Sequence, residues 1–566
     1  MKPTTNGSEP DTLIESVSGK VGAREPQPEL TTRQQQILDL MQDGKVNKEI
    51  ANTLGIGVGT VKQHIVALFK KLNVRNRAMA VSRGMTMQHD QEERSAALAV
   101  TEGIMERRPC VVLSVALPED ASPQAVRFLH GVMAALAFDN DALFLARKGN
   151  AGDIIFGIQR VTEYDLIKAL HAARSVFDDL SAHDHLLAND LRGGLTAGLA
   201  GASMNRFGGW TGEAVASAAI AISRDLVHDA TPGKLELGQS ARDMMQAFGI
   251  GNCRKIPNSF PFPELDVLHW TGERKIYGLI GRRAELAKLK AALANAGKAR
   301  GQLIYLEGET GMGKSRLCHE ASEFCTRQGG RVLFFRCLPV ATSSDDLFNT
   351  IKGNAQSLDE VMALLNAPAT QFPELVIIDD FHILAKEKQL ALAATATEAG
   401  AKGRLVILSG RRRIEGSHTQ IKSIYLRRLP TATIESLIRE VLGKQAAKVR
   451  PSGVTSLALT AAGVPLFAVE LARHYGDDVL ALPLLVVICA RLDNLRLDRK
   501  LLRCVARNDG CMTLEKASAG MGENVEILRQ SVGLAVAVGV LAADAAGCLS
   551  FTHPLLRQII DFLGME

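Results

Sequence analysis

A single short segment constrains the architecture of this chain more than any other. An apolar run at residues 302–306 leads directly into the glycine-rich sequence GETGMGKS at residues 308–315, and a helical pattern follows to about residue 328. Closely spaced glycines let successive backbone N–H groups converge on a phosphate, and the N-terminus of a helix adds partial positive charge. The order of strand, loop and helix therefore predicts an α/β domain that binds a nucleotide. The predicted phosphate-binding residues are Gly308, Gly311, Gly313, Lys314 and Ser315.

Two further apolar runs supply candidate catalytic and metal-binding groups. Residues 375–378 end in Asp379 and Asp380, and a buried strand that delivers a carboxylate can hold the coordination shell of magnesium. We therefore predict Asp379 and Asp380 as catalytic residues, with Ser315 and Asp379 as magnesium ligands; a solvated strand end is the alternative. Residues 405–409 precede Arg411, which can sense a γ-phosphate or belong to a solvated basic loop.

Positive charge is concentrated near the amino end. The whole chain carries +5, from 66 Lys and Arg against 61 Asp and Glu, which by itself indicates no nucleic-acid partner. Residues 30–87, however, hold nine basic and three acidic side chains, a net charge of +6 that leaves −1 for the remainder. Such clustering is typical of nucleic-acid binding, because neutralising phosphates releases counterions and supplies most of the non-specific affinity.

The pattern within this basic segment predicts a helix-turn-helix. Residues 47–54 form a short helix, glycines at 55, 57 and 59 surround a tight turn, and Thr60 is an N-cap for a second helix. The second helix has a packed face at helical spacing, formed by Val61, Ile65, Leu68 and Leu72. Its other faces can then enter a major groove. A basic three-helix module for protein interaction is the alternative.

These residues resemble the LuxR-type helix-turn-helix family. The shared pattern includes Leu30-Thr-x-Arg33, Asn47-Lys-Glu-Ile-Ala51, Thr60-Val-Lys62, Lys71-Leu72 and Val74-Arg-Asn-Arg77. The resemblance implies that Lys62, Gln63 and Val66 face bases, and that Thr60, His64 and Lys71 lie near the DNA backbone. The predicted partner is double-stranded DNA, and the predicted contacts are Lys48, Thr60, Lys62, Gln63, His64, Val66, Lys70 and Lys71.

Residues 278–566 resemble the STAND class of signal-transduction ATPases. Besides the phosphate loop, the resemblance rests on Gly281-Arg282-x-x-Glu285-Leu286, Gly463-Val-Pro465 and Phe551-Thr-His553-Pro. It implies a helical lid whose Pro465 touches adenine, and a winged helix whose His553 senses the nucleotide; a satisfied core histidine is the alternative for His553. It also implies a switch that is closed with ADP and open, often oligomeric, with ATP.

Residues 105–250 resemble, in order and spacing, the class III nucleotide cyclase domain. The matching segments are GDIIF at 152–156, LTAGLA at 195–200, GEAVASA at 212–218 and ATPG at 230–233. Asp153 keeps one metal position of that family, but residues 111–117 hold no second aspartate, and Ala216 and Ile220 stand where the family has Asn and Arg. We therefore expect no cyclisation. The expected role is to pair protomers or to bind a small effector.

Composition and periodicity predict a multidomain chain. The predicted order is a disordered tail (1–27), an all-α helix-turn-helix domain (28–88), a linker (89–104), an α+β cyclase-like domain (105–250), a second linker (251–277), a P-loop α/β ATPase core (278–428), a helical lid (429–480) and a winged-helix-like subdomain (481–566). No signal peptide and no apolar run of about 20 residues is visible, so no membrane partner is expected. Nine cysteines without a CxxC pair indicate reduced thiols in a cytoplasmic protein.

The combination predicts an ATP-regulated, DNA-binding transcription regulator of the LuxR type, in which a STAND-like switch controls DNA binding or oligomerisation. The expected cofactors are ATP or ADP with Mg²⁺. The expected partners also include an unknown effector and further copies of the chain, as a dimer or larger homo-oligomer. Any ATPase activity is expected to be slow and regulatory. The alternatives are an enzyme that makes a cyclic nucleotide and an ATP-driven signalling scaffold whose amino-terminal module binds protein.

Overall fold

The computed structural model of the 566-residue chain divides into two compact units, residues 1–90 and 91–566. In the first unit the structure describes residues 37, 40, 41, 50, 61, 65 and 68. In the second it describes 103–147, 149–250, 256–267, 277–296, 298, 300–338, 348–352, 357–368, 373–411, 421–476, 480–508 and 511–565.

The described residues of the first unit are all helical and mostly buried. Val61, Ile65 and Leu68 are at most 3% exposed, as are Ile37 and Ile50. Residues spaced by three and four lie on one face of a helix. The apolar face that the sequence predicts for the second helix of the helix-turn-helix is therefore buried at these three positions.

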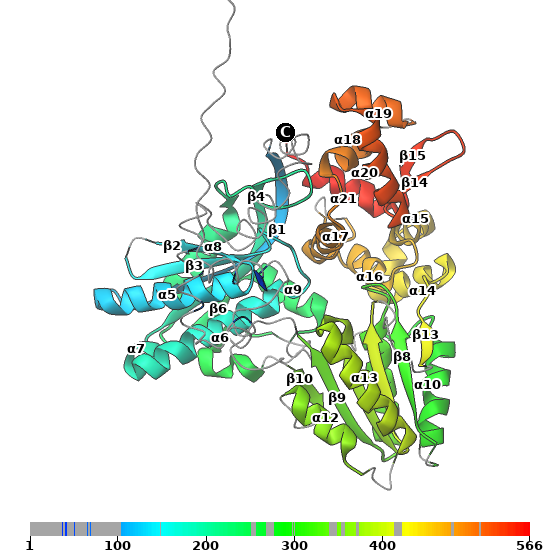
Figure 1. Ribbon diagram of the computed structural model, residues 1–566, viewed down its shortest axis with the longest axis horizontal. Helices are drawn as coiled ribbons and strands as arrows, with labels where there is room; N and C mark the ends of the chain where they lie inside the picture. Colours follow the sequence, from blue (N-terminus) through cyan, green and yellow to red (C-terminus); the bar gives the residue numbers. More distant parts are fainter. Residues whose placement is uncertain are drawn as a thin grey trace, which may run out of the picture. The chain divides into compact units, whose positions relative to one another are not determined.

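The first part of the second unit, called here the middle domain, is built on one mixed sheet of seven strands (Figure 1). The strands are β1 (Ile104–Ala116), β2 (Leu143–Ala146), β3 (Ala151–Phe156), β4 (Arg192–Met204), β5 (Ala216–Ser217), β6 (Lys234–Leu237) and β7 (Ser259–Pro261). They follow the order β2-β3-β1-β4-β6-β7, with β5 paired to β4. The two longest strands, β1 and β4, are antiparallel neighbours over their whole length.

Helices cover both faces of this sheet. They are α5 (Pro123–Asp139), α6 (Asp165–His183), α7 (His185–Asn189), α8 (Ala218–Asp229) and α9 (Gln239–Phe248). Successive side chains of a strand point to opposite faces. Accordingly, Val111 and Leu113 of β1 share a hydrophobic cluster with Leu129 of α5, whereas Val112 packs with Ile220 of α8. Burial on both faces explains why β1 has a continuous apolar run.

Strand β7 lies in the segment for which the sequence predicts a linker, residues 251–277. The prolines of this segment favour that prediction, but proline is tolerated on an edge strand, where one N–H needs no partner. β7 is such an edge, antiparallel to β6. Phe262, in the 3₁₀ helix η2 (Phe262–Val267), is fully buried and stacks on Phe177 with ring centroids 5.8 Å apart. Residues 259–267 therefore complete the middle domain.

The next part, called the P-loop domain, has a six-stranded sheet in the order β10-β9-β11-β12-β8-β13. The strands are β8 (Gln302–Glu307), β9 (Arg331–Cys337), β10 (Phe348–Lys352), β11 (Glu374–Asp379), β12 (Leu405–Gly410) and β13 (Lys422–Tyr425). Its helices are α10 (Arg283–Ala296), α11 (Lys314–Arg327), α12 (Leu358–Asn366), η3 (Phe381–Ile383) and α13 (Lys386–Ala401). Except for antiparallel β10, the strands are parallel, so their carboxyl ends meet at one edge.

The remaining part, called the helical domain, follows the P-loop domain. Its elements are α14 (Thr431–Leu442), η4 (Gly443–Lys448), α15 (Pro451–Ala461), α16 (Pro465–Arg473), α17 (Leu482–Leu495), α18 (Arg499–Arg507), α19 (Leu514–Met521), α20 (Val525–Ala537), β14 (Leu541–Ala543), β15 (Leu549–Phe551) and α21 (Pro554–Leu563). β14 and β15 form a two-stranded antiparallel hairpin. The winged-helix-like subdomain that the sequence predicts for residues 481–566 stays a prediction; helices and such a hairpin are elements that it would contain.

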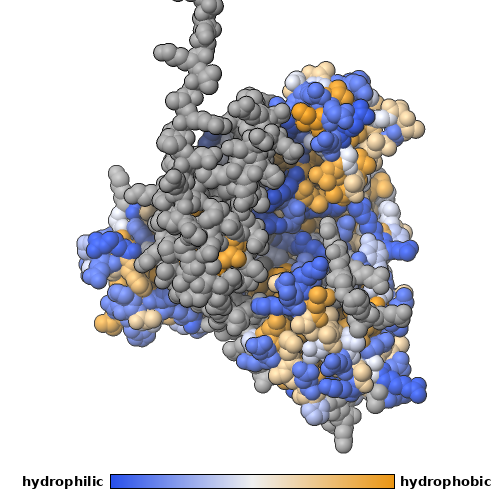
Figure 2. Space-filling model, viewed as in Figure 1, coloured by the Kyte–Doolittle hydropathy of each residue, from blue (hydrophilic) through white to orange (hydrophobic). Residues whose placement is uncertain are grey.

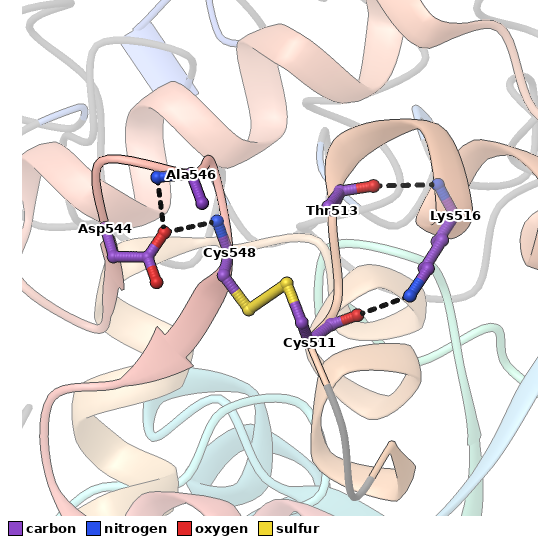
Figure 3. Close-up of a disulfide and its surroundings, with 6 residues drawn as sticks. All are labelled: Cys511, Thr513, Lys516, Asp544, Ala546 and Cys548. Carbon is purple, nitrogen blue, oxygen red and sulfur yellow. Dashed lines mark hydrogen bonds between the residues drawn. A yellow bond between two sulfur atoms is a disulfide. The ribbon is translucent and has the colours of Figure 1, made fainter.

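One pair of cysteines is joined in the helical domain (Figure 3). Cys511 and Cys548 form a disulfide with Cα atoms 5.2 Å apart, although they are separated by 37 residues. The isolated β-bridge between Met512 and Leu549 brings them together. The expectation that every cysteine is reduced is therefore wrong for this pair, because their spacing carries no sign of the contact. The free cysteines of the described residues are Cys110, Cys318, Cys325, Cys337, Cys489 and Cys504.

Hydrophilic and hydrophobic residues are mixed over the face shown in Figure 2. In the described part of the chain, none of the helices combines the length and the apolar character that crossing a bilayer requires.

Candidate nucleotide site

A cavity of about 230 Å³ lies where the P-loop domain meets the helical and middle domains. Its walls include residues 310–315, which span the loop after β8 and the first residues of α11, and Pro465 and Leu466 at the start of α16. Two middle-domain residues, Glu163 and Phe248, also line it. A cavity formed between domains, with a few convergent polar groups, is the usual form of a small-molecule site.

The loop that follows β8 adopts a conformation that depends on its glycines. Gly311 and Gly313 have φ angles of 78° and 91°, in the left-handed region that side chains disfavour. A Cβ atom on Gly311 would also lie 2.9 Å from Cβ of Leu466, so glycine permits the close approach of α16. Lys314 begins α11, and its Nζ donates to the carbonyl oxygens of Gly308 and Glu309 at 2.8 and 3.0 Å.

The ammonium group of Lys314 is held in a desolvated position. The residue is 7% exposed, and burial lowers the pKa of Lys314, although the nearby carboxylates of Asp380 and Asp379 oppose this effect. A buried cation whose hydrogen-bond partners are neutral carbonyl groups is suited to bind an anion. The predicted residues Gly311, Gly313, Lys314 and Ser315 all line the cavity. Gly308 does not line it, but its carbonyl oxygen accepts a hydrogen bond from Lys314.

Asp379 ends β11 and, unlike Asp380, is not one of the residues that line the cavity. Its carboxylate is fully buried, and Oδ1 accepts a hydrogen bond from the Ser409 hydroxyl. Within the described residues Oδ2 has no hydrogen-bond partner, and its nearest cation is Arg336 Nη1 at 3.8 Å. Buried carboxylate oxygens are normally satisfied. An orphaned Oδ2 together with the hydroxyl of Ser315 fits the oxygen ligands that Mg²⁺ prefers beside phosphates.

Asp380 is engaged by an arginine that the sequence did not indicate. Arg336, at the end of β9, donates from Nε to Asp380 Oδ2 at 2.8 Å, and both side chains are buried. Burial favours the neutral acid, but the Arg336 charge outweighs this effect and lowers the pKa of Asp380 to about 2. Asp380 therefore stays ionised and paired. A carboxylate with so low a pKa is a weak general base.

Arg411 directly follows β12 and reaches the same cavity. Its Nη2 donates to Oε2 of Glu163 at 2.8 Å. Burial alone would lower the pKa of Arg411, but the charge of Glu163 and a hydrogen bond with Tyr164 raise it. Burial in turn raises the pKa of Glu163, and the charge of Arg411 opposes that effect.

The helical domain closes the cavity with backbone and apolar contacts. The N–H of Leu466 donates to the carbonyl of Gly311 at 3.2 Å, and Pro465, the first residue of α16, lines the wall. The predicted contact of Pro465 with adenine stays a prediction. The buried Arg282 also lines the cavity and donates to the carbonyls of Met312 and Arg427 at 3.2 and 2.7 Å. Arg282 thus ties the phosphate loop to the segment that follows β13.

His553 lies outside the residues that line the cavity. It caps α21, with Nδ1 accepting from the N–H of Leu555 at 3.2 Å, and its ring packs edge-on to Phe467 at 5.4 Å. Burial, with the charge of Arg428, lowers the pKa of His553 to about 4. This placement corresponds to the alternative interpretation of a satisfied core histidine.

The predicted metal position of the middle domain is filled by protein groups. Asp153 of β3 is fully buried opposite Ser114, whose hydroxyl donates to Asp153 Oδ1 at 2.7 Å. Arg224 of α8 donates to Oδ2 from Nε and Nη2 at 3.0 and 2.6 Å. Ala216 lies on β5 and Ile220 is buried on α8, so neither supplies a polar group. Among the described residues, no group of three or more His, Cys, Asp or Glu could hold a metal ion.

Sequence reasoning missed several residues at or beside the cavity, among them Glu163, Arg336 and Ser409. Arg336 could have been found by aligning the parallel strands, since β9 and β11 pair it with Asp379. Ser409 lies on β12, within the apolar run that precedes Arg411. No local signal marks Glu163, because it reaches the cavity from a different domain.

The predicted DNA contacts Lys48, Thr60, Lys62, Gln63, His64, Val66, Lys70 and Lys71 lie outside the described residues.

Residues 28–83 match the family described as bacterial regulatory proteins, luxR family, and residues 278–408 match the AAA ATPase domain. The chain thus combines a LuxR-type helix-turn-helix region with a P-loop ATPase domain of the AAA type.

Curated relatives match the amino-terminal region. The transcriptional regulatory protein DesR of Bacillus subtilis (strain 168) is 46% identical over 54 residues, which are 10% of this chain and 27% of that protein. The chain thus spans about a quarter of the length of this relative.

Solved structures match other parts of the chain. A STAND protein with a tetratricopeptide repeat sensor from Pyrococcus horikoshii covers 51% of this chain and 43% of its own, at 16% identity and a TM-score of 0.26. The guanylyl cyclase Cya2 covers 25% of this chain and 80% of its own, at 15% identity and a TM-score of 0.22.

Proposed function

We propose that this chain is a transcription regulator in which nucleotide binding to the P-loop domain controls DNA binding by the amino-terminal region. The observation that carries the proposal is the presence in one chain of a LuxR-family match at 28–83 and a preformed phosphate loop with the buried Lys314. The net charge of +6 on residues 30–87 supports DNA as the partner. The double-stranded DNA, the ATP or ADP and the homo-oligomer are all part of this proposal.

The proposed cofactors are ATP or ADP with Mg²⁺. Ser315 and Asp379 would hold the metal ion, which would neutralise phosphate charge when bound. Lys314 would hold the outer phosphates, and Pro465 and Leu466 would cover the apolar part of the nucleotide. Because Asp380 is tied to Arg336, it is poorly suited to remove a proton from water. This arrangement supports a slow regulatory ATPase rather than a rapid one.

A non-catalytic middle domain is the second part of the proposal. Arg224 and Ser114 satisfy the Asp153 carboxylate, so the position predicted for a catalytic metal already has protein partners. We propose that the domain regulates the P-loop domain, pairs protomers or binds an effector. Incubating the purified chain with ATP and Mn²⁺ tests this part, because appreciable cyclic nucleotide would favour the cyclase alternative.

A genomic pull-down tests the function as a whole. The full chain is incubated with fragmented genomic DNA in the presence of ATP, of ADP or of neither, and the retained fragments are sequenced. We expect specific fragments whose yield depends on the nucleotide, and we expect Lys314→Ala to remove that dependence. Fragments that are retained equally in all three conditions would contradict the switch, and no retention at all would favour the protein-binding scaffold.

A further inference from the structure

The loop between β3 and α6, residues 157–164, belongs to the middle domain but reaches the nucleotide cavity. Its Glu163 side chain is 11% exposed and lines the cavity together with P-loop residues. The neighbouring Tyr164 is 7% exposed. A carboxylate at this depth has lost most of its hydration, so its protein partners must hold it there.

The partners of Glu163 are groups that a nucleotide-binding site uses for phosphate. Arg411 donates to its Oε2 at 2.8 Å, and the Thr310 side chain of the phosphate loop also forms a hydrogen bond with it. Burial raises the pKa of Glu163, and the positive charges of Arg411 and Lys314 oppose this effect. Carboxylates and phosphates accept the same charge-assisted hydrogen bonds from Arg and Lys. Glu163 therefore presents to this cavity the kind of charge that a phosphate presents.

Two other cationic side chains near Asp379 and Asp380 already have hydrogen-bond partners. Arg336 is paired with Asp380, and Lys314 donates to two backbone carbonyls. Of the arginines that the structure describes at the ends of β9 and β12, Arg336 is paired with Asp380 and Arg411 is paired with Glu163. A further phosphate would therefore meet the negative charge of Glu163 rather than an open guanidinium.

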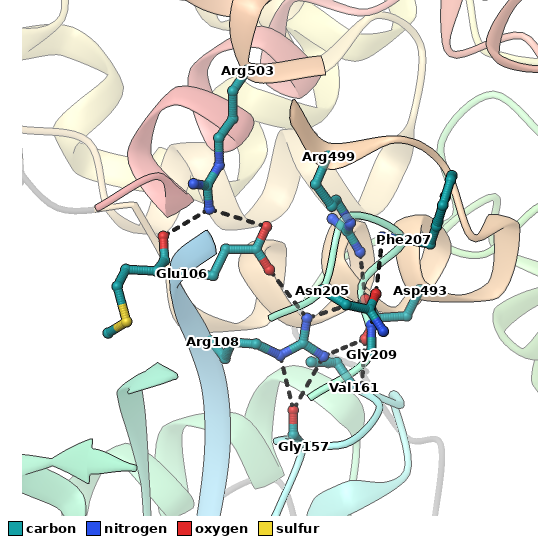
Figure 4. A network of polar contacts seen from close by, with 11 residues as sticks. Glu106, Arg108, Gly157, Val161, Asn205, Phe207, Gly209, Asp493, Arg499 and Arg503 are labelled. Carbon is teal, nitrogen blue, oxygen red and sulfur yellow. Dashed lines mark hydrogen bonds and ion pairs between the residues drawn. The ribbon is translucent and has the colours of Figure 1, made fainter. Parts of the chain in front are cut away.

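The same loop is fixed at its other end to the helical domain (Figure 4). The N–H of Val161 donates to Asp493 Oδ2 of α17 at 2.8 Å, and Arg108 of β1 donates to the carbonyl of Gly157 at 3.4 Å. Asp493 in turn pairs with Arg108 and Arg499 at 2.5 Å each, and all three side chains are buried. The position of Glu163 thus depends on contacts two residues earlier in the loop.

We propose that Glu163 determines which nucleotide the cavity accepts in this conformation. Its carboxylate occupies the subsite for the terminal phosphate of a nucleoside triphosphate, so the site accepts a diphosphate and excludes a triphosphate while the 157–164 loop is in place. A triphosphate binds when Arg411 exchanges Glu163 for the terminal phosphate, which releases the loop. The inference rests on the proposed nucleotide binding and assigns its selectivity to one residue.

Nucleotide titrations of the full chain test this selectivity. ADP and the non-hydrolysable analogue AMP-PNP are titrated calorimetrically, in Mg²⁺, into the unchanged chain and into Glu163→Gln, which keeps the size of the side chain and removes its charge. We expect AMP-PNP to bind Glu163→Gln about tenfold more tightly or better, because apposed like charges strongly disfavour association. The affinity for ADP is expected to stay unchanged, which also shows that the variant is folded.

Two further variants separate this role from a merely structural one. Glu119→Gln removes an exposed carboxylate of the same domain and should change neither affinity. In an Arg411→Met background, Glu163→Gln should gain much less affinity for AMP-PNP, because the two residues act through one contact.

Each outcome has a distinct meaning. If ADP binds but Glu163→Gln leaves the ratio of the two affinities unchanged, the role of Glu163 is overturned and the proposed function stands. If neither nucleotide binds any of these proteins, the proposed nucleotide site fails, and the inference fails with it.

Discussion

Lys314 shows at the scale of one residue what the phosphate loop is built to do. In the structure its ammonium group is desolvated and shares its hydrogen bonds between two carbonyls of its own loop. We expect Lys314→Ala to weaken ADP binding about 10- to 100-fold, the range that hydrogen bonds to a charged group supply. Lys298→Ala, which removes a lysine just before β8, is the matched control. Calorimetric titration measures both variants, and equal affinity for ADP in all three proteins would refute this role.

His553 predicts a pH dependence of stability. Burial lowers the pKa of His553 to about 4, whereas the unfolded chain has an ordinary value of about 6.5. Between these values the unfolded chain binds a proton that the folded chain does not, so stability is present above pH 6.5 and is lost as the pH falls towards 4. The full difference amounts to roughly 3 kcal/mol.

The variant His553→Asn isolates this contribution. Asparagine can also cap α21 by accepting from the N–H of Leu555, but it does not titrate. We expect the thermal midpoint of His553→Asn to fall less between pH 7.5 and pH 5 than that of the unchanged chain. The remaining fall in the thermal midpoint includes a contribution from His382. Burial lowers the pKa of His382 to about 4 as well. If the thermal midpoints of the two proteins fell equally with pH, His553 would be ruled out as a source of the pH dependence.

At the residue scale the sequence predicts the groups that act within one strand–loop–helix unit. Lys314, Ser315 and Asp379 follow from local patterns, because each directly follows a buried strand or a glycine turn. Glu163 could not be predicted, because its partner Arg411 is 248 residues away and belongs to another domain. For His553 the sequence allows two interpretations, a nucleotide sensor and a satisfied core histidine, because the residue pattern does not show whether the side chain faces the cavity.

At the scale of secondary-structure elements, α17 is one of the helices that connect the middle and helical domains. Asp493 of α17 holds Arg108, Arg499 and the N–H of Val161 together (Figure 4). We expect Asp493→Asn to destabilise the fold by about 3–5 kcal/mol, because removing one partner of a buried ion pair leaves the others uncompensated. Chemical denaturation followed by circular dichroism measures this loss.

The matched control for this prediction is Asp561→Asn on α21. Its pair with Arg507 spans 3.7 Å, and both side chains are at least half exposed. Exposed pairs contribute about 0–1 kcal/mol. Asp493→Asn should also shift nucleotide preference towards AMP-PNP, because it frees the loop that carries Glu163. A stability loss no larger than that of the control would show that α17 does not hold the two domains together.

The order of elements was largely predictable, but the end of the middle domain was not. Apolar runs at 302–306, 375–378 and 405–409 correspond to β8, β11 and β12, because parallel strands covered on both faces are apolar throughout. Residues 251–277 contain several prolines and predict a linker. The structure nevertheless places β7 and η2 there, since an edge strand tolerates proline and Phe262 supplies core volume.

At the scale of the whole molecule, the distribution of charge carries the proposed division of labour. Residues 30–87 hold +6 and the rest of the chain holds −1, so a salt-dependent interaction with DNA should depend on the amino-terminal region alone. For a protein that neutralises several phosphates, the logarithm of the binding constant falls linearly with the logarithm of the salt concentration, with a slope of about −0.9 per phosphate contact.

The double variant Lys62→Ala plus Lys71→Ala tests this division. Each lysine is expected to neutralise one phosphate or reach one base, so the variant should reduce the magnitude of the salt slope by about 1 to 2. Lys234→Ala plus Lys386→Ala makes the same change in net charge on exposed sites of the second unit and should leave the slope unchanged. Both are measured by fluorescence anisotropy on the fragments retained in the pull-down, over a series of potassium chloride concentrations. Equal slopes for the two double variants would mean that overall charge, not the amino-terminal region, governs the interaction with DNA.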